Sequence, residues 1–467
     1  MLVIKHAKDT LTVNTCELPK SLIFVCQHIA DSGGTPWLVG GCVRDLLLGI
    51  RPKDFDIEVY GLKPEQLEIV LAPLGKTEHV GKRFGVTKLW LKEMELDIAL
   101  PRTEYKTADG HRGFSVESNP DMEPETATLR RDFSINAMMF NPLDNTLLDF
   151  HGGQDDLINK KLRHVSPAFI EDPLRPLRAM QFAARFQLRL DRKTAELCYL
   201  LLTEAGTLPE SRIWGEWQKW SHAPYPSYGL LVLQDSGWLS LYPELAALVG
   251  CAQDNRWHPE GDVWIHTLLA CDMAAVIADR SKLGLQTREH LLFAALCHDL
   301  GKPSCTFADE RKKLRSPGHC EAGVTLSKQV LGQICAPKSI AQFILPLVRE
   351  HMAHMHGKPT ARAIRRLAHR LAPSNIECWE MLIEADASGR SPAPASRPAL
   401  SWLHEADRLN HHQNKPEKIL TGKILIDLGV PPGPAMGETI SQAYEAQLDG
   451  RFNDKESAIR WYSTYFK

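Results

Sequence analysis

The sequence of 467 residues lacks the features of several large protein classes. None of its apolar runs approaches the roughly 20 residues that a membrane-spanning helix needs. The apolar run near its start is too short for the core of a signal peptide. Eleven cysteines are present but no C-x-x-C pair occurs, which fits reduced thiols better than a disulfide framework or a cysteine-rich zinc site. We therefore expect a cytoplasmic protein with no membrane partner.

An excess of charge of one sign is also missing. The 55 Lys and Arg residues nearly balance the 57 Asp and Glu residues, for a formal net charge of −2. This balance excludes a uniformly basic nucleic-acid coat protein, but it allows a local basic patch. Residues 160–193 are such a patch, rich in Lys and Arg. Neither a GxxxxGK[ST] loop nor a GxGxxG fingerprint is present, so the two commonest glycine-rich nucleotide motifs are excluded.

The pattern of apolar residues predicts an α+β head. Strands are expected where apolar and β-branched residues alternate, and short helices where the apolar spacing is three to four residues. Residues 101–128 are polar, with glycines and prolines, and predict a long loop. The expected helices are 22–30 and 42–49, and the expected strands are 36–41, 54–60 and one or two within 86–100.

Beyond about residue 150 the pattern is helical almost to the end. A Pro- and Ser-rich stretch, 388–398, reads as a linker, and 399–467 as a helical tail. We expect four domains: a head at 1–150, a helical body at 151–250, a further helical domain at 251–390, and the linker with its tail at 391–467.

Two aspartates in the head suggest metal chemistry. Asp54 and Asp56 stand two residues apart on an expected strand, so both point to one face, with α-carbons about 6.6 Å apart. Adjacent carboxylates repel each other unless a cation neutralises them, and Mg²⁺ prefers such oxygen ligands. Alone, the pair is a weak signal and fits two solvated aspartates on an edge strand better than a metal site. A glycine turn, Gly40–Gly41, precedes it and allows a phosphate to approach the backbone and the next helix N-terminus.

Three motifs in order carry a family resemblance: "WLVGGCVRDLLLG…KDFDIEVYG", "RRDFSINAM" and "EDPLRPLRAMQFAARF". Together they resemble bacterial class II tRNA nucleotidyltransferases, the CCA-adding enzymes, which are grouped with poly(A) polymerases. The resemblance is dense over about 35–220. It implies that Asp54 and Asp56 are catalytic metal ligands for Mg²⁺. It also implies further roles: nucleotide contacts by Gly41, Arg44 and Arg131, support by Asp132 and Asn136, and a third carboxylate at Asp97, which reads equally well as a surface residue.

The third motif implies how a base is chosen. Asp172, Arg175 and Arg178 follow each other at intervals of three, which predicts one shared helix face. In the resembling family the first two read the base without a template. A carboxylate accepts from the amino group that cytosine and adenine share, and a guanidinium donates to the adjacent ring nitrogen. An ordinary intrahelical salt bridge is the alternative.

The chain departs from the family in two places within that motif. Gln181 stands where the family usually has a further arginine, and Pro176 could distort the first helical turn. The segment 102–120 resembles the flexible loop used in the switch from C to A addition, and 209–220 resembles the helical segment that follows the base-reading region.

A second ordered set lies in 251–390. His266, the pair His298–Asp299 and Asp386 match the H…HD…D pattern of HD-domain metal phosphohydrolases. Imidazoles and carboxylates together bind transition metals such as Ni²⁺ or Mn²⁺. His319 and His351 are candidates for further ligands or phosphate contacts. The resemblance implies phosphatase and 2′,3′-cyclic phosphodiesterase chemistry. The basic stretch 361–370 is either an RNA contact or a solvated face.

The sequence therefore predicts an α+β nucleotidyltransferase head with a small mixed sheet, followed by an all-α body that includes an HD domain. The expected function is template-independent addition of CCA to tRNA from CTP and ATP, with no DNA partner and with a second phosphohydrolase activity. Three alternatives stay open: a poly(A) polymerase or A-adding enzyme on the same scaffold, an HD phosphohydrolase whose head only binds nucleotide or RNA, and a non-enzymatic RNA-binding protein. The sequence predicts no oligomeric state.

Overall fold

A computed structural model describes residues 18–80, 86–106, 114–390 and 392–466 of the chain. The chain forms two compact units, one of residues 1–216 and 228–238, the other of 217–227 and 239–467. The finer division into four domains stays a prediction. Within the described ranges, no helix is both long and apolar enough to cross a membrane.

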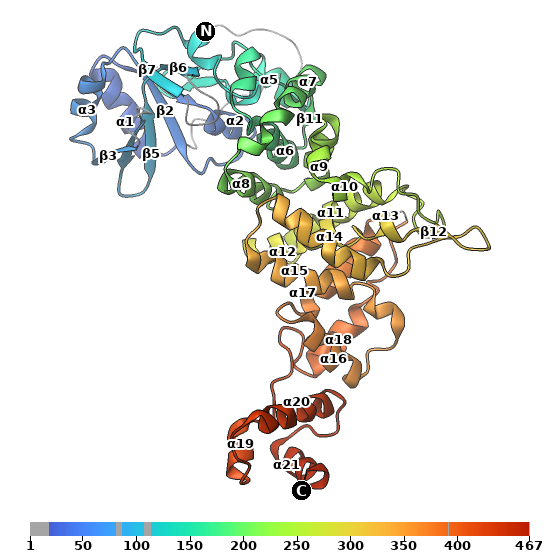
Figure 1. Ribbon diagram of the computed structural model, residues 1–467. Coiled ribbons are helices and arrows are strands. Elements are labelled where there is room, and N and C mark those ends of the chain that lie inside the picture. The colour runs from blue at the N-terminus through green and yellow to red at the C-terminus, as the bar shows by residue number, and fades with distance from the viewer. Residues whose placement is uncertain (1–17, 81–85, 107–113, 391, 467) are drawn as a thin grey trace. The chain divides into compact units, whose positions relative to one another are not determined.

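A mixed sheet organises the first unit (Figure 1). Among the described residues its strand order is β3-β4-β5-β2-β1-β8-β9. β2 pairs with β5 in parallel, and the other neighbouring pairs are antiparallel. The strands are β1 (Thr35–Val39), β2 (Phe55–Tyr60), β3 (Lys76–Val80), β4 (Val86–Trp90), β5 (Glu95–Ala99), β8 (Met139–Asn141) and β9 (Thr146–Leu148).

Helices flank this sheet and then take over the chain. α1 (Lys20–Asp31) packs on β1 and on α3 (Pro64–Leu71), and α2 (Gly41–Leu47) follows the glycine turn. The expected helices and strands of the head are therefore present, and 86–100 forms two strands. The following helices are α4 (Pro124–Thr128), α5 (Gly153–Ile158), α6 (Arg175–Phe186), α7 (Arg192–Leu200), α8 (Glu210–Ser221) and α9 (Pro226–Asp235).

The expected loop at 101–128 is wrong. β6 (Arg102–Lys106) and β7 (Phe114–Ser118) pair antiparallel, and α4 follows them. Two short stretches, T-E-Y-K and F-S-V-E, alternate with period two, which suits strands, but the glycines and charges between them hide the signal. Residues 107–113 of the segment that resembles a flexible loop lie outside the described residues.

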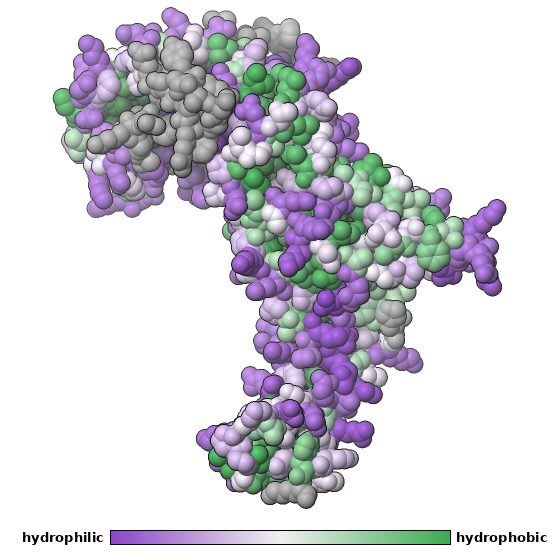
Figure 2. Space-filling model, viewed as in Figure 1, coloured by the Kyte–Doolittle hydropathy of each residue, from purple (hydrophilic) through white to green (hydrophobic). Residues whose placement is uncertain are grey.

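The second unit is helical. α11 (Val263–Arg280), α12 (Leu285–Cys297), α14 (His319–Gln333), α15 (Lys338–Glu350) and α17 (Ile376–Ser388) pack on one another. A small hairpin of β12 (Phe307–Ala308) and β13 (Leu314–Arg315) projects from this unit, and Figure 2 shows its tip to be hydrophilic. The other helices are α10 (Pro243–Ala246), α13 (Lys302–Cys305), α16 (Ala361–Leu371), α18 (Leu400–Arg408), α19 (Gly422–Asp427), α20 (Pro434–Leu448) and α21 (Lys455–Tyr465).

Candidate functional sites

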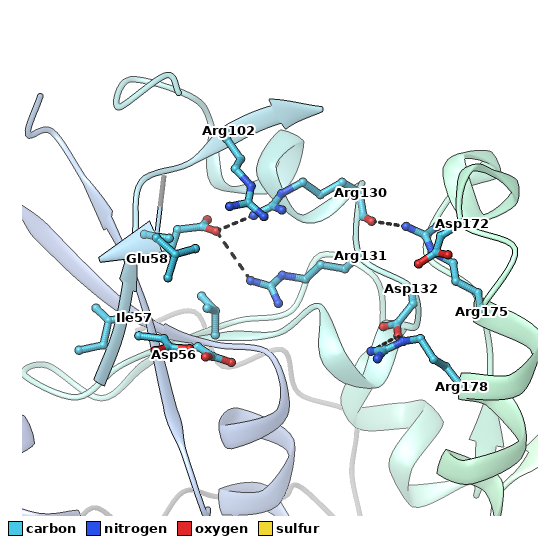
Figure 3. A pocket seen from close by; sticks show the side chains of 14 residues that line it. Asp56, Ile57, Glu58, Arg102, Arg130, Arg131, Asp132, Asp172, Arg175 and Arg178 are labelled. Carbon is cyan, nitrogen blue, oxygen red and sulfur yellow. Dashed lines mark hydrogen bonds and ion pairs between the residues drawn. The ribbon is translucent and has the colours of Figure 1, made fainter. Parts of the chain in front are cut away.

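A cavity of about 460 Å³ opens beside β2 in the first unit (Figure 3). Carboxylates lie on its sheet side, and arginines from three other segments also line it. The lining residues are Val39, Asp56, Ile57, Glu58, Val86, Asp97, Ala99, Arg102, Arg130, Arg131, Asp132, Asp172, Arg175 and Arg178.

The carboxylates of the sheet lie at the mouth of this cavity. Asp56 is on β2, directly opposite Asp97 in the parallel register of β2 and β5. Asp54 is exposed and immediately precedes β2. Partial burial and the nearby charges of Asp97 and Asp54 raise the pKa of Asp56, while the Arg131 guanidinium opposes this. Mutual repulsion of this kind is what a divalent cation relieves. In the structure Lys88 contacts Asp97 at 3.3 Å.

Glu58 lies on β2, two residues after Asp56, and binds two arginines of the cavity. This buried carboxylate receives the Tyr60 hydroxyl at 2.6 Å, and Arg130 lies 3.2 Å and Arg131 3.7 Å from its second oxygen (Figure 3). Gly40 is required beside Arg131: its φ is +77°, and a β-carbon there would lie 3.0 Å from the Arg131 guanidinium. The glycine turn therefore makes room for an arginine side chain.

A buried polar relay connects α2 to α6. Arg44 donates to Asn136, Asn136 donates to Asp132 at 3.0 Å, and Asp132 pairs with Arg178 at 2.6 Å. Burial alone would raise the pKa of Asp132, but the Arg178 cation and the Asn136 hydrogen bond hold it below its usual range. Asp132 and Asn136 therefore connect Arg44 to Arg178, and their expected support of nucleotide binding stays a prediction. Arg44 itself is 3% exposed, pairs with Asp45 and packs on Phe186.

Gly41, Arg44 and Asp54 are not among the residues that line the cavity. A β-carbon on Gly41 would lie 3.4 Å from the Arg44 guanidinium, so the turn accommodates this arginine as well. The nucleotide contacts expected of Gly41 and Arg44, and the catalytic role of Asp54, stay predictions.

The expected single helix face of the base-reading residues is wrong. α6 begins at Arg175, so Asp172 lies before the helix, where its side chain accepts from the Leu174 backbone N–H. Asp172 pairs with Arg212 of α8 at 3.0 Å and not with Arg175. The Arg175 guanidinium donates to the carbonyls of Ala168 and Arg130. Even so, the three residues line one cavity (Figure 3).

The two departures from the family pattern have structural explanations. Pro176 is in the first turn of α6, where proline fits because the missing N–H has no helical acceptor. Gln181 is 1% exposed inside α6 and does not line the cavity. An arginine at this position would have to be accommodated in the core.

The second unit holds a dense histidine and carboxylate cluster. His266, His298 and Asp386 place one ligand atom each within 4.8 Å of one another. His266 Nε2 lies 3.1 Å from Asp386 and 3.8 Å from Asp299 Oδ2, and His298 Nε2 lies 3.1 Å from the same Oδ2. The expected H…HD…D set is therefore brought together, from α11, the end of α12 and α17.

His319 and His351 join this cluster from the other side. Their Nε2 atoms lie 3.6 Å and 3.9 Å from Asp299 Oδ1 and 3.2 Å from each other. Each opposite ring nitrogen is bound: His319 Nδ1 to Ser316 O, His351 Nδ1 to Val348 O and His298 Nδ1 to Ala295 O. Such contacts leave Nε2 of each imidazole directed inward as a metal ligand.

Burial and neighbouring charges set the pKa values of these groups. Burial alone would raise the pKa of Asp299, but His298 and Lys302 hold it well below its usual range. Burial lowers the pKa of His351 to about 4, so this imidazole is neutral. The pKa of His266 is raised instead, because contacts with Asp386 and Glu260 outweigh its burial. His298 Nε2 lies 3.1 Å from the buried Asp299 Oδ2, and Lys302 Nζ lies 2.6 Å from the same oxygen. These residues fit a metal ion.

Known proteins share both regions. The Poly A polymerase head domain matches residues 36–163 and the HD domain matches residues 263–394. The multifunctional CCA protein of Nitrosococcus oceani is 37% identical over 363 residues, which cover 76% of this chain and 85% of that protein. This chain belongs to the multifunctional CCA protein family.

A second multifunctional CCA protein agrees with this membership, and a solved structure shares the fold. The Pasteurella multocida member is 35% identical over 76% of this chain and 84% of its own length. The crystal structure of the Bacillus stearothermophilus CCA-adding enzyme in complex with CTP covers 96% of this chain and 99% of that one, at 20% identity and a TM-score of 0.64. The family resemblance, the fold class and the expectation of a tRNA nucleotidyltransferase are thereby confirmed.

Sequence reasoning missed several contacts of both sites. Glu58 is two residues from Asp56, and Arg130 directly precedes Arg131. This proximity to predicted residues was the only sequence signal that could have identified them. Arg212 lies in the helical segment that resembled the family, yet no local pattern pairs it with Asp172. In the second unit Glu260 supports His266 at 2.8 Å, and Lys302 pairs with Asp299 at 2.6 Å.

The basic stretch 361–370 forms α16, and its cations bind the chain itself. Arg362 and Arg366 pair with Asp449 at 2.9 and 2.6 Å, and Arg365 donates to the Leu448 carbonyl at the end of α20. Arg370 pairs with Glu350. These pairs within the chain account for the cations of α16, and the alternative of an RNA contact stays a prediction.

Proposed function

We propose that the head of this multifunctional CCA protein adds C, C and A to the 3′ end of tRNA at the cavity beside β2. The observation that carries the proposal is the arrangement of Asp56 opposite Asp97, in a cavity also lined by arginines from three other segments. In the reaction the 3′-hydroxyl oxygen attacks the α-phosphorus of CTP or ATP. The bond to the β-phosphate breaks, and pyrophosphate leaves.

The residues divide this work by charge. Asp54 and Asp56 would hold Mg²⁺, which when bound supplies Lewis-acid stabilisation of the phosphate charge and activation of the hydroxyl. Arg130 and Arg131, positioned by Glu58, face the space where a triphosphate is neutralised. The relay through Asp132 keeps Arg178 at the other wall.

Base choice rests on Asp172 and Arg175. Arg212 orients Asp172, whose carboxylate accepts from the amino group of cytosine or adenine. Two main-chain carbonyls fix Arg175, and a guanidinium has five N–H donors, so donors remain for the ring nitrogen. Uracil and guanine present a carbonyl beside an N–H there and meet two mismatched contacts.

One assay tests the head. tRNA ending before CCA is incubated with CTP and ATP together and singly, and the products are sequenced. Addition of CCA alone supports the proposal. A long A tail supports the poly(A) polymerase alternative, and no addition supports a head that only binds nucleotide or RNA.

A second activity is proposed for the HD cluster, because the buried His266, His298 and Asp386 place one ligand atom each within 4.8 Å of one another. A bound transition metal such as Ni²⁺ or Mn²⁺ would activate water for phosphoester hydrolysis. Lys302 and Arg390 lie beside the ligands and supply positive charge for a phosphate. Hydrolysis of 2′,3′-cyclic AMP by the full chain with each metal tests this proposal, and no hydrolysis with any metal would contradict it.

A further inference from the structure

The hairpin of β12 and β13, residues 307–315, is built directly on the HD cluster. The chain leaves the cluster at Lys302, whose Nζ lies 2.6 Å from Asp299 Oδ2. It returns at His319, whose Nε2 lies 3.6 Å from Asp299 Oδ1. Between these two contacts the hairpin projects from the second unit (Figure 1). The chemistry proposed for the HD cluster gives this projection no role.

The base of the hairpin is fixed by close contacts. Gly301 packs on the start of α14 so tightly that a β-carbon there would clash with the His319 carbonyl oxygen. The hydroxyls of Thr306 and Ser316 lie 2.7 Å apart across the base. A projection anchored in this way keeps its direction relative to the HD cluster, as a surface that positions a substrate requires.

The tip of the hairpin is basic. Its nine residues hold four Lys and Arg against two Asp and Glu, in a chain with a formal net charge of −2. Asp309 serves the turn itself: one oxygen accepts from the backbone N–H groups of Arg311 and Lys313, and the other accepts from the Arg315 guanidinium at 2.7 Å. Arg311, Lys312 and Lys313 follow one another at the tip, which Figure 2 shows to be hydrophilic.

An aromatic ring accompanies these cations. Phe307, the first residue of β12, is 51% exposed. Surfaces that bind single-stranded nucleic acid combine cations for the phosphates with exposed rings on which bases stack. An acidic protein partner would use the cations but would leave the ring without a function. Because the adjacent HD cluster is proposed to hydrolyse phosphoesters, RNA is the partner whose chemistry fits both features.

We propose that the β12–β13 hairpin binds the strand of a single-stranded RNA whose 3′ end enters the HD site. The proposal rests on the proposed HD function and names its substrate class: RNA that ends in a 2′,3′-cyclic phosphate, in preference to a free cyclic nucleotide. In the reaction, water adds to phosphorus, one ribose oxygen leaves and takes up a proton, and a phosphate monoester remains. The hairpin contributes binding and takes no part in this step.

The test compares two substrates of the full chain, with Mn²⁺ or Ni²⁺ present. One is 2′,3′-cyclic AMP, and the other is a single-stranded RNA of about eight nucleotides that ends in a 2′,3′-cyclic phosphate. The parent chain should show a KM for the RNA at least about 10-fold below that for the free nucleotide, because several phosphates are contacted. The RNA reaction should also weaken more steeply with salt.

A triple variant of the tip, Arg311→Ala with Lys312→Ala and Lys313→Ala, removes the phosphate contacts. We expect its KM for the RNA to rise at least about 10-fold, and the salt slope of the RNA reaction to fall by about 2. Its KM for 2′,3′-cyclic AMP should stay unchanged. A matched control removes three exposed lysines of the same unit outside the hairpin and should behave as the parent chain: Lys282→Ala, Lys328→Ala and Lys338→Ala.

Phe307→Ala tests the ring separately. Loss of one stacked base should raise the KM for the RNA about 5–150-fold and leave the salt slope unchanged. An unchanged KM for the RNA in this variant would contradict the stacking contact and with it the choice of RNA as partner. Circular dichroism of each variant establishes that it is folded.

The remaining outcomes separate this proposal from the HD function. Hydrolysis of neither substrate by the parent chain contradicts the HD function itself. Hydrolysis of 2′,3′-cyclic AMP with no preference for the RNA leaves the HD function standing and overturns the substrate class. Equal KM values for the RNA in the tip variant and its control overturn the hairpin contact, as does a rise that is equal for both substrates. If only binding of a poly-glutamate peptide responds to the tip variant, the partner is an acidic protein and the proposal fails.

Discussion

The head cavity and the HD cluster use opposite strategies for charge. The cavity has about 460 Å³ of open space, and its arginines are held by partners away from its centre: Glu58, Asp132 and main-chain carbonyls. The HD cluster is closed, and its charged groups contact one another directly. A site that must accept two different nucleotides needs space with fixed walls, whereas a metal centre needs ligands already converged.

The strongest way to break this comparison is to inactivate each site separately. Asp54→Ala with Asp56→Ala should reduce nucleotide addition by at least about 10³-fold, because metal stabilisation of phosphate charge contributes several kcal/mol. Hydrolysis of 2′,3′-cyclic AMP should stay unchanged. His298→Ala with Asp299→Ala should do the reverse. Both activities are measured on the same preparations.

Loss of both activities in either double variant, while circular dichroism stays that of the parent chain, would contradict two independent sites. A single shared centre would then have to explain both reactions.

The next largest effect is expected for the ion pair of Asp132 and Arg178 in the cavity wall. Asp132→Asn leaves Arg178 without its carboxylate and should lower the free energy of unfolding by about 2–3 kcal/mol. This is less than for a fully buried pair, because the Arg178 side chain is 32% exposed. Denaturant titration of the first unit measures this change in the free energy of unfolding. Asp31→Asn on the exposed end of α1 is the control.

The same pair predicts a pH dependence. The pKa of Asp132 is lower in the folded protein than in the unfolded chain, so on acidification the unfolded chain takes up the proton first. The stabilisation is complete at neutral pH and is lost as the pH falls below about 4 and through the folded pKa. Unfolding of Asp132→Asn should therefore depend less steeply on pH in this range. Equal slopes for both proteins would show that other carboxylates dominate.

A smaller effect is expected for base choice. Asp172→Ala removes the acceptor for the base amino group, at a cost of about 1–3 kcal/mol, or about 5–150-fold in discrimination against UTP and GTP. Arg212→Ala keeps the carboxylate but frees it, and should relax selectivity less. Single-nucleotide incorporation with each triphosphate measures both variants, and unchanged selectivity in Asp172→Ala would mean that another group reads the base.

The smallest effect is expected where charges are solvated. Arg366 pairs with Asp449, and the two side chains are 34% and 28% exposed. Arg366→Ala should therefore cost less than about 1 kcal/mol, and less still at high salt. Hydrogen exchange of α20 at two salt concentrations measures this, with Arg460→Ala on α21 as the control. A loss as large as that of Asp132→Asn would show that exposure is a poor guide here.

Local patterns predicted much of the head. Alternation identified β2 and placed Asp56 on it, whereas Asp54 lies just before the strand, and apolar spacing identified α2 behind its glycine turn. The hairpin of β6 and β7 was missed because its strands are short and its connection is rich in glycine and charge. Pairing partners were missed for another reason: Asp172 and Arg212 are 40 residues apart, and periodicity carries no information on such contacts.

The HD ligands show the same limit from the other side. The adjacent His298 and Asp299 form a motif that is visible in the sequence. His319 and His351 come close to Asp299 only through the packing of their helices. The sequence made them candidates without assigning them to a position. Glu260 and Lys302 needed the folded arrangement to be recognised.

The relay from Arg44 through Asn136 and Asp132 to Arg178 has a consequence for how the head can vary. Each member of the relay is the hydrogen-bond or ion-pair partner of the next. A substitution at one position therefore changes the effect of substitutions at the others, and their effects on the free energy of unfolding should not add. Arg44 and Arg178 lie on different helices and share no direct contact in the relay, yet we expect their contributions to the free energy of unfolding to be coupled. Whether a substitution at Arg44 or Arg178 is tolerated therefore depends on the residues at positions 132 and 136.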